Sequence, residues 1–268
     1  MSVEIFSLKD KNVLVIGADG ILGPVFCDGY AAAGGNVALI DRIAPEKQAA
    51  ELSAKYTIQT LAYGLDVRDI NAFEKLLAEI ENNLGPIDIL HCNIAWKGTE
   101  TDKFFDDDED YSPDVWRDIM SVNLDALFFT ATKVGKLMAK RNQGSIILTG
   151  SIYGLVAPDQ RIYEGSEYEG RAITSPGVYS ASKAGVIGIT RHLASLWGSK
   201  GVRVNCLVPG GVESGQNEVF SKNYSHRIPL GRMAQKEDMV GGAIYLASDA
   251  SSYVTGQVLS IDGGLTCW

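Results

Sequence analysis

The chain has 268 residues, 46% of them hydrophobic and 21% charged, and its formal net charge is −9. This composition is typical of a globular protein that is long enough to bury a large core. The acidic balance argues against a nucleic-acid partner, because binding to phosphates needs a basic surface. The longest apolar runs are far too short to cross a bilayer, so we expect no membrane partner.

The N-terminal segment and the cysteines indicate the cellular setting. Residues 1–10 are charged and lack the apolar core of a signal peptide. The cysteines, Cys27, Cys92, Cys206 and Cys267, stand singly and without the spacing of a metal site. We therefore expect reduced thiols, no metal and a cytoplasmic location.

Short apolar runs alternate along the chain with longer segments of helical period, as in βαβ units around a parallel sheet. The expected strands are residues 12–16, 36–40, 58–66, 87–92, 145–149, 202–208 and 258–261. The expected helices begin after the first strand, where the helical segment runs through Ala33, and continue with residues 71–84, 116–138, 179–197 and 237–247. The runs are apolar on successive residues, so we expect helices on both faces of the sheet. The sequence predicts an α/β fold: a Rossmann-type doubly wound parallel sheet of about seven strands, with residues 1–268 as a single domain.

Two polar segments interrupt this alternation, and we expect both to be insertions on the active-site side. Residues 97–112 include an acidic run that lacks the ligand spacing of a calcium loop, so we predict a solvated loop. Residues 155–176 are rich in Tyr, Glu, Arg and Gly. Both segments follow strand ends, where open α/β sheets bind their ligands.

A glycine-rich turn directly follows the first expected strand and opens a helix. Glycines at such a turn let backbone N–H groups approach a pyrophosphate. At the end of the next strand, the Asp41 carboxylate can bind both ribose hydroxyls and repel a 2′-phosphate, although Arg42 beside it opposes that repulsion. The pattern predicts a dinucleotide site for NAD, with NADP as the less favoured cofactor. The expected contacts of the turn are Gly17, Asp19, Gly20, Ile21, Leu22 and Gly23.

Tyr179 and Lys183 are spaced so that both side chains lie on one face of the expected helix 179–197. A phenol has an ordinary pKa of about 10 and is a poor base at neutral pH. A nearby ammonium and a cationic nicotinamide both favour the phenolate. The pair therefore suits a general acid/base that acts on an alcohol or a carbonyl.

Taken in order, these features resemble the short-chain dehydrogenase/reductase family over nearly the entire chain. The matching elements are the glycine turn, the motif CNIA at 92–95 for the usual NNAG, Asn123, Ser151, the YxxxK motif of Tyr179 and Lys183, and YVTGQVLSIDGG at 253–264. The resemblance implies an NAD(P)-dependent oxidoreductase that interconverts an alcohol and a ketone by hydride transfer. The segment between Ser151 and Tyr179 is about twice the usual length in the family, because it contains the second insertion.

The resemblance also implies roles for individual residues. Tyr179 would exchange a proton with the substrate oxygen, and Lys183 would lower the pKa of Tyr179 and hold the nicotinamide ribose. Ser151 would position the reacting oxygen, and Asn123 would support a water-linked proton relay near Lys183. The implied cofactor contacts beyond the glycine turn are Asp41, Arg42, Asp66, Val67, Asn93, Tyr179, Lys183, Pro209, Val212 and Ser214.

The insertion 155–176 places polar side chains near the expected active site. An apolar steroid or acyl chain would leave such groups unpaired at a cost in free energy, whereas a polyhydroxylated substrate would pair them. We therefore expect a sugar, polyol, sugar acid or sugar derivative as the small-molecule substrate, with Arg161 and Arg171 as candidate anion contacts. The alternative is a surface flap or an oligomer contact.

Two other functions stay open. A 3-oxoacyl-thioester (acyl-carrier-protein) reductase would prefer NADPH and a basic docking surface, against which stand Asp41 and the acidic balance. A catalytically silent dinucleotide sensor or scaffold need not combine Asn123, Ser151, Tyr179 and Lys183. Members of the family usually assemble through their two long helices and C-terminal region, so we expect a homodimer or homotetramer.

Overall fold

The computed structural model describes residues 3–168 and 170–268, without the side chains of Val3, Tyr168 and Arg171. Seven parallel strands form one sheet in the order β3-β2-β1-β4-β5-β8-β9. The strands are β1 (Asn12–Ile16), β2 (Asn36–Asp41), β3 (Thr60–Gly64), β4 (Ile89–Cys92), β5 (Gly144–Thr149), β8 (Val202–Pro209) and β9 (Val258–Ile261). The strand order reverses between β1 and β4, and open α/β sheets bind ligands at such a point. The predicted doubly wound parallel sheet is confirmed.

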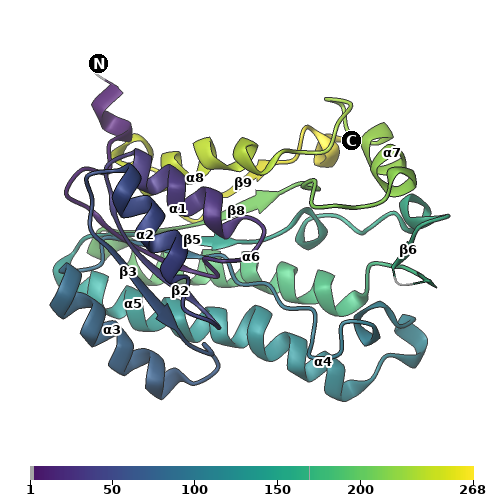
Figure 1. Cartoon of the computed structure of the whole chain (residues 1–268), viewed down its shortest axis with the longest axis horizontal. Helices are drawn as coiled ribbons and strands as arrows, with labels where there is room; N and C mark the ends of the chain where they lie inside the picture. Colours follow the sequence, from purple (N-terminus) through teal and green to yellow (C-terminus); the bar gives the residue numbers. More distant parts are fainter. Residues whose placement is uncertain (1–2, 169) are drawn as a thin grey trace.

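Helices cover both faces of this sheet, and Figure 1 shows α1, α2 and α8 on one side and α3 and α5 on the other. The α-helices are α1 (Gly23–Ala32), α2 (Glu46–Lys55), α3 (Ile70–Leu84), α4 (Pro113–Met120), α5 (Leu127–Arg141), α6 (Gly177–Trp197), α7 (Glu218–His226) and α8 (Val240–Ala247). Side chains alternate along a strand. Val13 and Val15 of β1 therefore pack in the core under α1 and α8, whereas Leu14 and Ile16 pack in the core under α3, α5 and α6.

Short helical turns complete the chain. The 3-10 turns are η1 (Val3–Phe6), η2 (Lys103–Phe105), η3 (Asp108–Asp110), η5 (Ile152–Gly154), η6 (Gln160–Tyr163), η7 (Gly198–Lys200), η8 (Lys236–Met239), η9 (Asp249–Ser251) and η10 (Leu265–Cys267). Within the described residues, no helix is long and apolar enough to span a membrane. Cys27, Cys92 and Cys206 are buried free thiols, and Cys267 is exposed.

The expected helix 116–138 differs from the structure in one informative way. Helical backbone extends from α4 into α5, but the segment η4 (Ser121–Ala126) between them is a π-helix. A π-helical turn inside an α-helix is rare and is frequent at functional sites. The sequence pattern did not reveal it, because a segment of 6 residues is too short to change the apolar periodicity of the long helical stretch around it.

Both insertions are anchored to the fold. In the first, the Asp108 carboxylate accepts a hydrogen bond of 2.8 Å from the Gly177 amide at the start of α6. Residues 107–110 of the acidic run are exposed, as predicted for a solvated loop, and this bond ties the run to α6. In the second insertion, Gln160 exchanges two hydrogen bonds with the backbone of Ser175, which closes the segment on itself. Between Gln160 and Ser175 in the sequence lies a small antiparallel hairpin of β6 (Glu167–Tyr168) and β7 (Arg171–Ala172).

Candidate active site

The glycine turn between β1 and α1 is shaped by contacts that exclude a side chain at two of its glycines. Gly17 has a φ of +82°, and a Cβ there would lie 2.5 Å from the Asn93 carbonyl oxygen. A Cβ on Gly23 would lie 2.3 Å from the Ala18 oxygen. At Gly20 the nearest atom would be 4.0 Å away, so the packing of the chain itself does not require glycine there. The turn therefore leaves open space beside Gly20, at the start of a helix.

Asp41 at the end of β2 is held against this turn. One carboxylate oxygen accepts a hydrogen bond of 2.9 Å from the Asp19 amide, and the other accepts one of 2.7 Å from the Arg42 amide. Each oxygen can accept a further bond, since a carboxylate offers about four acceptor sites. The Arg42 guanidinium lies 4.7 Å above the ring of Trp96. The Asp41 carboxylate thus points to the glycine turn, whereas the guanidinium of its neighbour Arg42 points to Trp96.

Trp96 is the centre of a network that sequence reasoning missed. Its indole N–H donates to Asp118 at 3.0 Å. Arg68 joins Asp118 to Asp66, and hydrogen bonding from Arg68 holds the pKa of the Asp66 carboxyl below its usual value although partial burial opposes this. The tryptophan directly follows the CNIA motif, which is the signal that could have singled it out.

Ser151 and Tyr179 meet although the long second insertion separates them in the sequence. Ser151 follows β5 and is buried, and its hydroxyl lies close enough to the Tyr179 side chain to influence the pKa of the phenol. Burial raises the pKa of the Tyr179 phenol, and the nearby Ser151 hydroxyl opposes that rise. The insertion folds away from the direct path between the two residues and does not separate them.

Lys183 lies one helical turn after Tyr179 and is buried, with 1% of its surface exposed. Its ammonium donates to the carbonyls of Thr149 at 3.1 Å and Ile94 at 3.2 Å, and lies 5.9 Å from the centre of the Tyr179 ring. Two of its three N–H groups thus bond the carboxyl ends of β5 and β4. Burial lowers the pKa of Lys183 to about 8.

Asn123 sits in the π-helical segment and is fully buried. The side-chain amide oxygen of Asn123 accepts a hydrogen bond of 2.7 Å from the backbone N–H of Trp96. Its amide nitrogen donates one of 3.0 Å to the backbone carbonyl of Trp96. Asn123 and Lys183 therefore bond the same segment after β4: Asn123 bonds Trp96, and Lys183 bonds Ile94. The geometry makes Asn123 a support of this segment.

A buried histidine under the site was also missed by sequence reasoning. His91 in β4 bonds the Tyr30 hydroxyl at 2.8 Å on one ring nitrogen and the Thr149 hydroxyl at 2.9 Å on the other. Burial lowers the pKa of His91 to about 3, so the ring is neutral at physiological pH. Thr149 is the residue whose carbonyl receives the Lys183 ammonium.

The remaining cofactor candidates lie after the carboxyl ends of their strands. Asn93 follows β4 and donates to the Gly17 carbonyl at 3.0 Å. Val67 is buried in the core, and Ile21 is exposed on the glycine turn with Leu22 as the N-cap of α1. Pro209 ends β8, Val212 bridges to Ala234, and Ser214 is held by two hydrogen bonds to Gln216.

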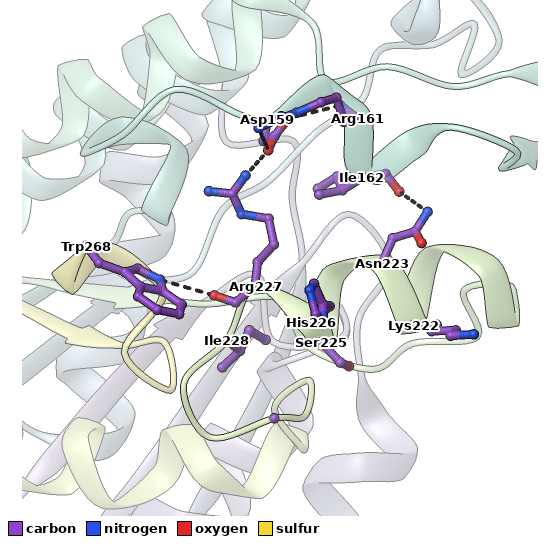
Figure 2. A pocket seen from close by; sticks show the side chains of 11 residues that line it. Asp159, Arg161, Ile162, Lys222, Asn223, Ser225, His226, Arg227, Ile228 and Trp268 are labelled. Carbon is purple, nitrogen blue, oxygen red and sulfur yellow. Dashed lines mark hydrogen bonds and ion pairs between the residues drawn. The ribbon is translucent and has the colours of Figure 1, made fainter.

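Arg161 lies elsewhere, at a hollow of about 1080 Å³ between η6, α7 and η10. Figure 2 shows the guanidinium of Arg227 pointing at Asp159, which also receives two hydrogen bonds of 2.8 Å from the Arg161 guanidinium. Among the described residues that line this hollow, none belongs to the set Asn123, Ser151, Tyr179 and Lys183. The side chain of Arg171 lies outside the described part of the chain.

Comparisons with known proteins show which proteins the chain is similar to. Residues 20–266 match a family model described as enoyl-(acyl carrier protein) reductase. The chain is 32% identical to sorbose reductase of Candida albicans over 99% of its own length and 90% of that protein. It is 33% identical to galactitol 2-dehydrogenase (L-tagatose-forming) of Cereibacter sphaeroides, with 98% of each chain covered.

The solved structure of a short-chain dehydrogenase from Leptospira borgpetersenii with bound NAD⁺ superposes with a TM-score of 0.83. It is 31% identical and the match covers 99% of this chain and 96% of that one. Other matched proteins are named as NADP-dependent, and one is named 3-oxoacyl-[acyl-carrier-protein] reductase.

Proposed function

The chain belongs to the short-chain dehydrogenase/reductase family, and on this premise we propose that it interconverts the alcohol and ketone forms of a sugar, polyol or sugar derivative, with NAD as its preferred cofactor. The observation that carries the proposal is the meeting of Ser151, Tyr179 and Lys183 beside the carboxyl ends of β4 and β5. Relatives of the chain are named as dehydrogenases and reductases of sugars and polyols, and some are named with NAD⁺ or as NADP-dependent.

The residues present fit a dinucleotide. The open space beside Gly20 suits a pyrophosphate at the start of α1, and the anchored Asp41 carboxylate has acceptor sites left for ribose hydroxyls. Asp66 and Val67 would flank the adenine, and Asn93, Pro209, Val212 and Ser214 would line the nicotinamide side. When bound, the nicotinamide supplies the chemistry of hydride transfer.

Side chains of the protein itself transfer the proton. In the reducing direction the Tyr179 hydroxyl gives its proton to the substrate oxygen, and in the oxidising direction its phenolate takes that proton back. The Ser151 hydroxyl holds the reacting oxygen against Tyr179. Burial alone keeps Tyr179 protonated, so the positive charge of Lys183 is needed to make the phenolate accessible.

NAD is proposed over NADP because of how Asp41 and Arg42 are held. A fixed carboxylate at this position repels a 2′-phosphate. The guanidinium that could offset the repulsion is stacked on Trp96 instead. Relatives are named with NAD⁺ and with NADP, so their names do not decide the cofactor. The proposed preference for NAD therefore rests on Asp41 and Arg42 of this chain.

A sugar or polyol substrate is supported by the names of two relatives, sorbose reductase and galactitol 2-dehydrogenase, which match over 90% and 98% of their own lengths. A 3-oxoacyl-thioester reductase is the second candidate, since a relative of that name matches at 30% identity. Asp41 and the net charge of −9 weigh against an NADPH-dependent enzyme that docks an acidic carrier.

We propose a homodimer or homotetramer built on the long helices. Phe129 of α5 and Leu196 of α6 are large apolar side chains with 45% and 52% of their surface exposed, which is the kind of surface that self-association covers. The cytoplasmic location and the single-domain organisation stay predictions of the sequence.

The proposal is tested by following nicotinamide absorbance with NAD and NADP in parallel. The panel holds hexitols, ketoses, sugar acids and sugar phosphates beside 3-oxoacyl thioesters, and the Tyr179→Phe variant is the blank. Turnover of a polyol or ketose with NAD, lost in the variant, is the expected result. Turnover of acyl thioesters alone, with NADPH, contradicts both the substrate class and the cofactor preference.

A further inference from the structure

Two tyrosines beside the catalytic phenol face each other through their hydroxyl groups. Tyr153 lies in η5, two residues after Ser151, and Tyr163 lies in η6 of the second insertion. Their hydroxyl oxygens are 3.4 Å apart, and both side chains are half-buried. The Tyr153 ring stands edge-on to the Tyr179 ring, with 6.5 Å between the ring centres. The pair is therefore next to the place where the substrate oxygen must bind.

The two tyrosines are positioned by separate elements. The Tyr163 ring packs on Phe220 of α7 at 5.4 Å, and Phe220 packs on Tyr224 at 5.5 Å. The Tyr224 hydroxyl in turn accepts the Gly211 amide at 2.7 Å, in the segment after β8. Because packing restrains Tyr163 from behind, its hydroxyl is held in place without any substrate.

The contact between the hydroxyls is long, and although the Tyr163 hydroxyl has Ser175 as a second polar neighbour, the Tyr153 hydroxyl is paired, among the described residues, only through this contact. Hydroxyl–hydroxyl hydrogen bonds cluster at about 2.7–2.8 Å and weaken as they lengthen. A phenol can donate one hydrogen bond and accept others. Burial raises the pKa of both Tyr153 and Tyr163, so both stay neutral at physiological pH and keep their donor hydrogens. The pair can thus take up one or two hydroxyl groups from a ligand.

We propose that Tyr153 and Tyr163 form the specificity-determining contact of the substrate site and bind the hydroxyl groups next to the reacting carbon of a neutral polyol or ketose. This inference rests on the proposed function and deepens it. A substrate without those hydroxyls leaves the half-buried Tyr153 hydroxyl with only its long contact to Tyr163 in the described part of the chain, and this discriminates against that substrate.

The geometry of the insertion favours a neutral substrate over an anionic one. Its arginine, Arg161, is bonded to Asp159 at the hollow lined by α7, whereas its tyrosine, Tyr163, is the residue directed to Tyr153. The described part of the insertion therefore contributes a neutral hydroxyl to the pair.

The test uses the full chain with Tyr153→Phe, with Tyr163→Phe and with both changes. Each substitution removes one hydroxyl and keeps the ring, so the aromatic packing is retained. Tyr253→Phe is the matched control, because Tyr253 is fully exposed. Two substrates are compared, a hexitol and a secondary hexanol that carries only the reacting hydroxyl, and cofactor affinity is followed by NADH fluorescence.

We expect each single variant to lose roughly tenfold in kcat/KM for the hexitol, mainly through KM, with the hexanol rate and the NADH affinity unchanged. Equal losses on both substrates, or no loss on the hexitol, overturn the assignment of the pair. If the wild-type protein oxidises the hexanol or reduces an acyl thioester and turns over no polyol or ketose, the proposed function itself fails, and the inference with it. If Tyr163→Phe no longer binds NADH, Tyr163→His takes its place, because histidine keeps a hydrogen-bonding group at this position. If Tyr163→His binds NADH but does not turn over the hexitol, the result counts against the pair.

Discussion

The backbone amide of Asp19 donates a 2.9 Å hydrogen bond to the carboxylate of Asp41. This bond joins the glycine turn after β1 to the carboxyl end of β2, two segments that meet only in the folded sheet. It orients a negative charge at one end of the proposed cofactor site. The charge is therefore both a structural tie and a candidate filter for the cofactor.

Replacing Asp41 by Asn should separate these two roles. The amide oxygen can still accept the Asp19 N–H, but the negative charge is gone. We expect NADP affinity to rise and NAD affinity to fall, each by roughly tenfold, in titrations of NADH and NADPH fluorescence. Glu51→Gln, which removes an exposed carboxylate on α2, is the control. An unchanged ratio of the two affinities would show that Asp41 does not select the cofactor.

The glycine turn offers a matched pair of alanine variants. Gly17→Ala places a Cβ 2.5 Å from the Asn93 oxygen at a φ of +82°, so we expect a loss of about 2 kcal/mol or more in the free energy of unfolding. Gly20→Ala has room for its Cβ in the chain itself, so stability should hold while NADH affinity falls by at least roughly fivefold. Urea unfolding and NADH titration of both variants measure the two effects. Unimpaired NADH binding in Gly20→Ala would remove the turn from the cofactor site.

Tyr179→Phe is expected to lower kcat by about 10²- to 10⁴-fold, the usual contribution of a general acid/base. The ring stays in place, so NADH affinity should change little. Tyr253→Phe, on the surface, should behave as wild type. Turnover of the variant near the wild-type rate would exclude Tyr179 as the proton donor.

His91 should make the fold sensitive to acid. Its pKa is about 3 in the folded chain and about 6.5 when the chain is unfolded, so the unfolded state binds more protons below pH 6.5. Stability is therefore greatest above pH 6.5 and is lost as the pH falls toward 3, at about 1.4 kcal/mol per pH unit from this one group. Urea unfolding at pH 7.5 and pH 5 measures the loss.

The matched variant is His91→Gln, which keeps hydrogen-bonding groups between Tyr30 and Thr149 but does not titrate. It should be less stable than wild type at pH 7.5 and should lose roughly 2 kcal/mol less between pH 6.5 and pH 5. The same acid sensitivity in variant and wild type would place the titrating group elsewhere.

Predictions from the sequence succeeded where local pattern and burial coincide. The strand β1 has the expected ends, because its fully buried apolar run marks a strand covered on both faces. The ends of β9 were also predicted, although this edge strand is only half-buried. The helices α2 and α7 were not predicted. Each buries only two residues, so its apolar periodicity is too weak to stand out from a loop.

The sequence by itself determined the alternation of strands and helices, and with it the parallel sheet and the edge at which the site lies. It also determined that Tyr179 and Lys183 share a helix face, since a four-residue spacing is a property of the helix alone. These features depend on local periodicity, which one segment carries without its neighbours.

Only the tertiary structure decided which side chains meet across the site. Three contacts at the site join residues from different elements. They are the contact of Ser151 with Tyr179, the hydrogen bonds of Asn123 to Trp96 and the contact between the hydroxyls of Tyr153 and Tyr163. Such contacts depend on how helices and insertions pack above the sheet, and no spacing along the chain encodes a distance through space. For the same reason the sequence did not reveal that Arg161, a substrate candidate, lies at the hollow lined by α7, where Arg227 also pairs with Asp159.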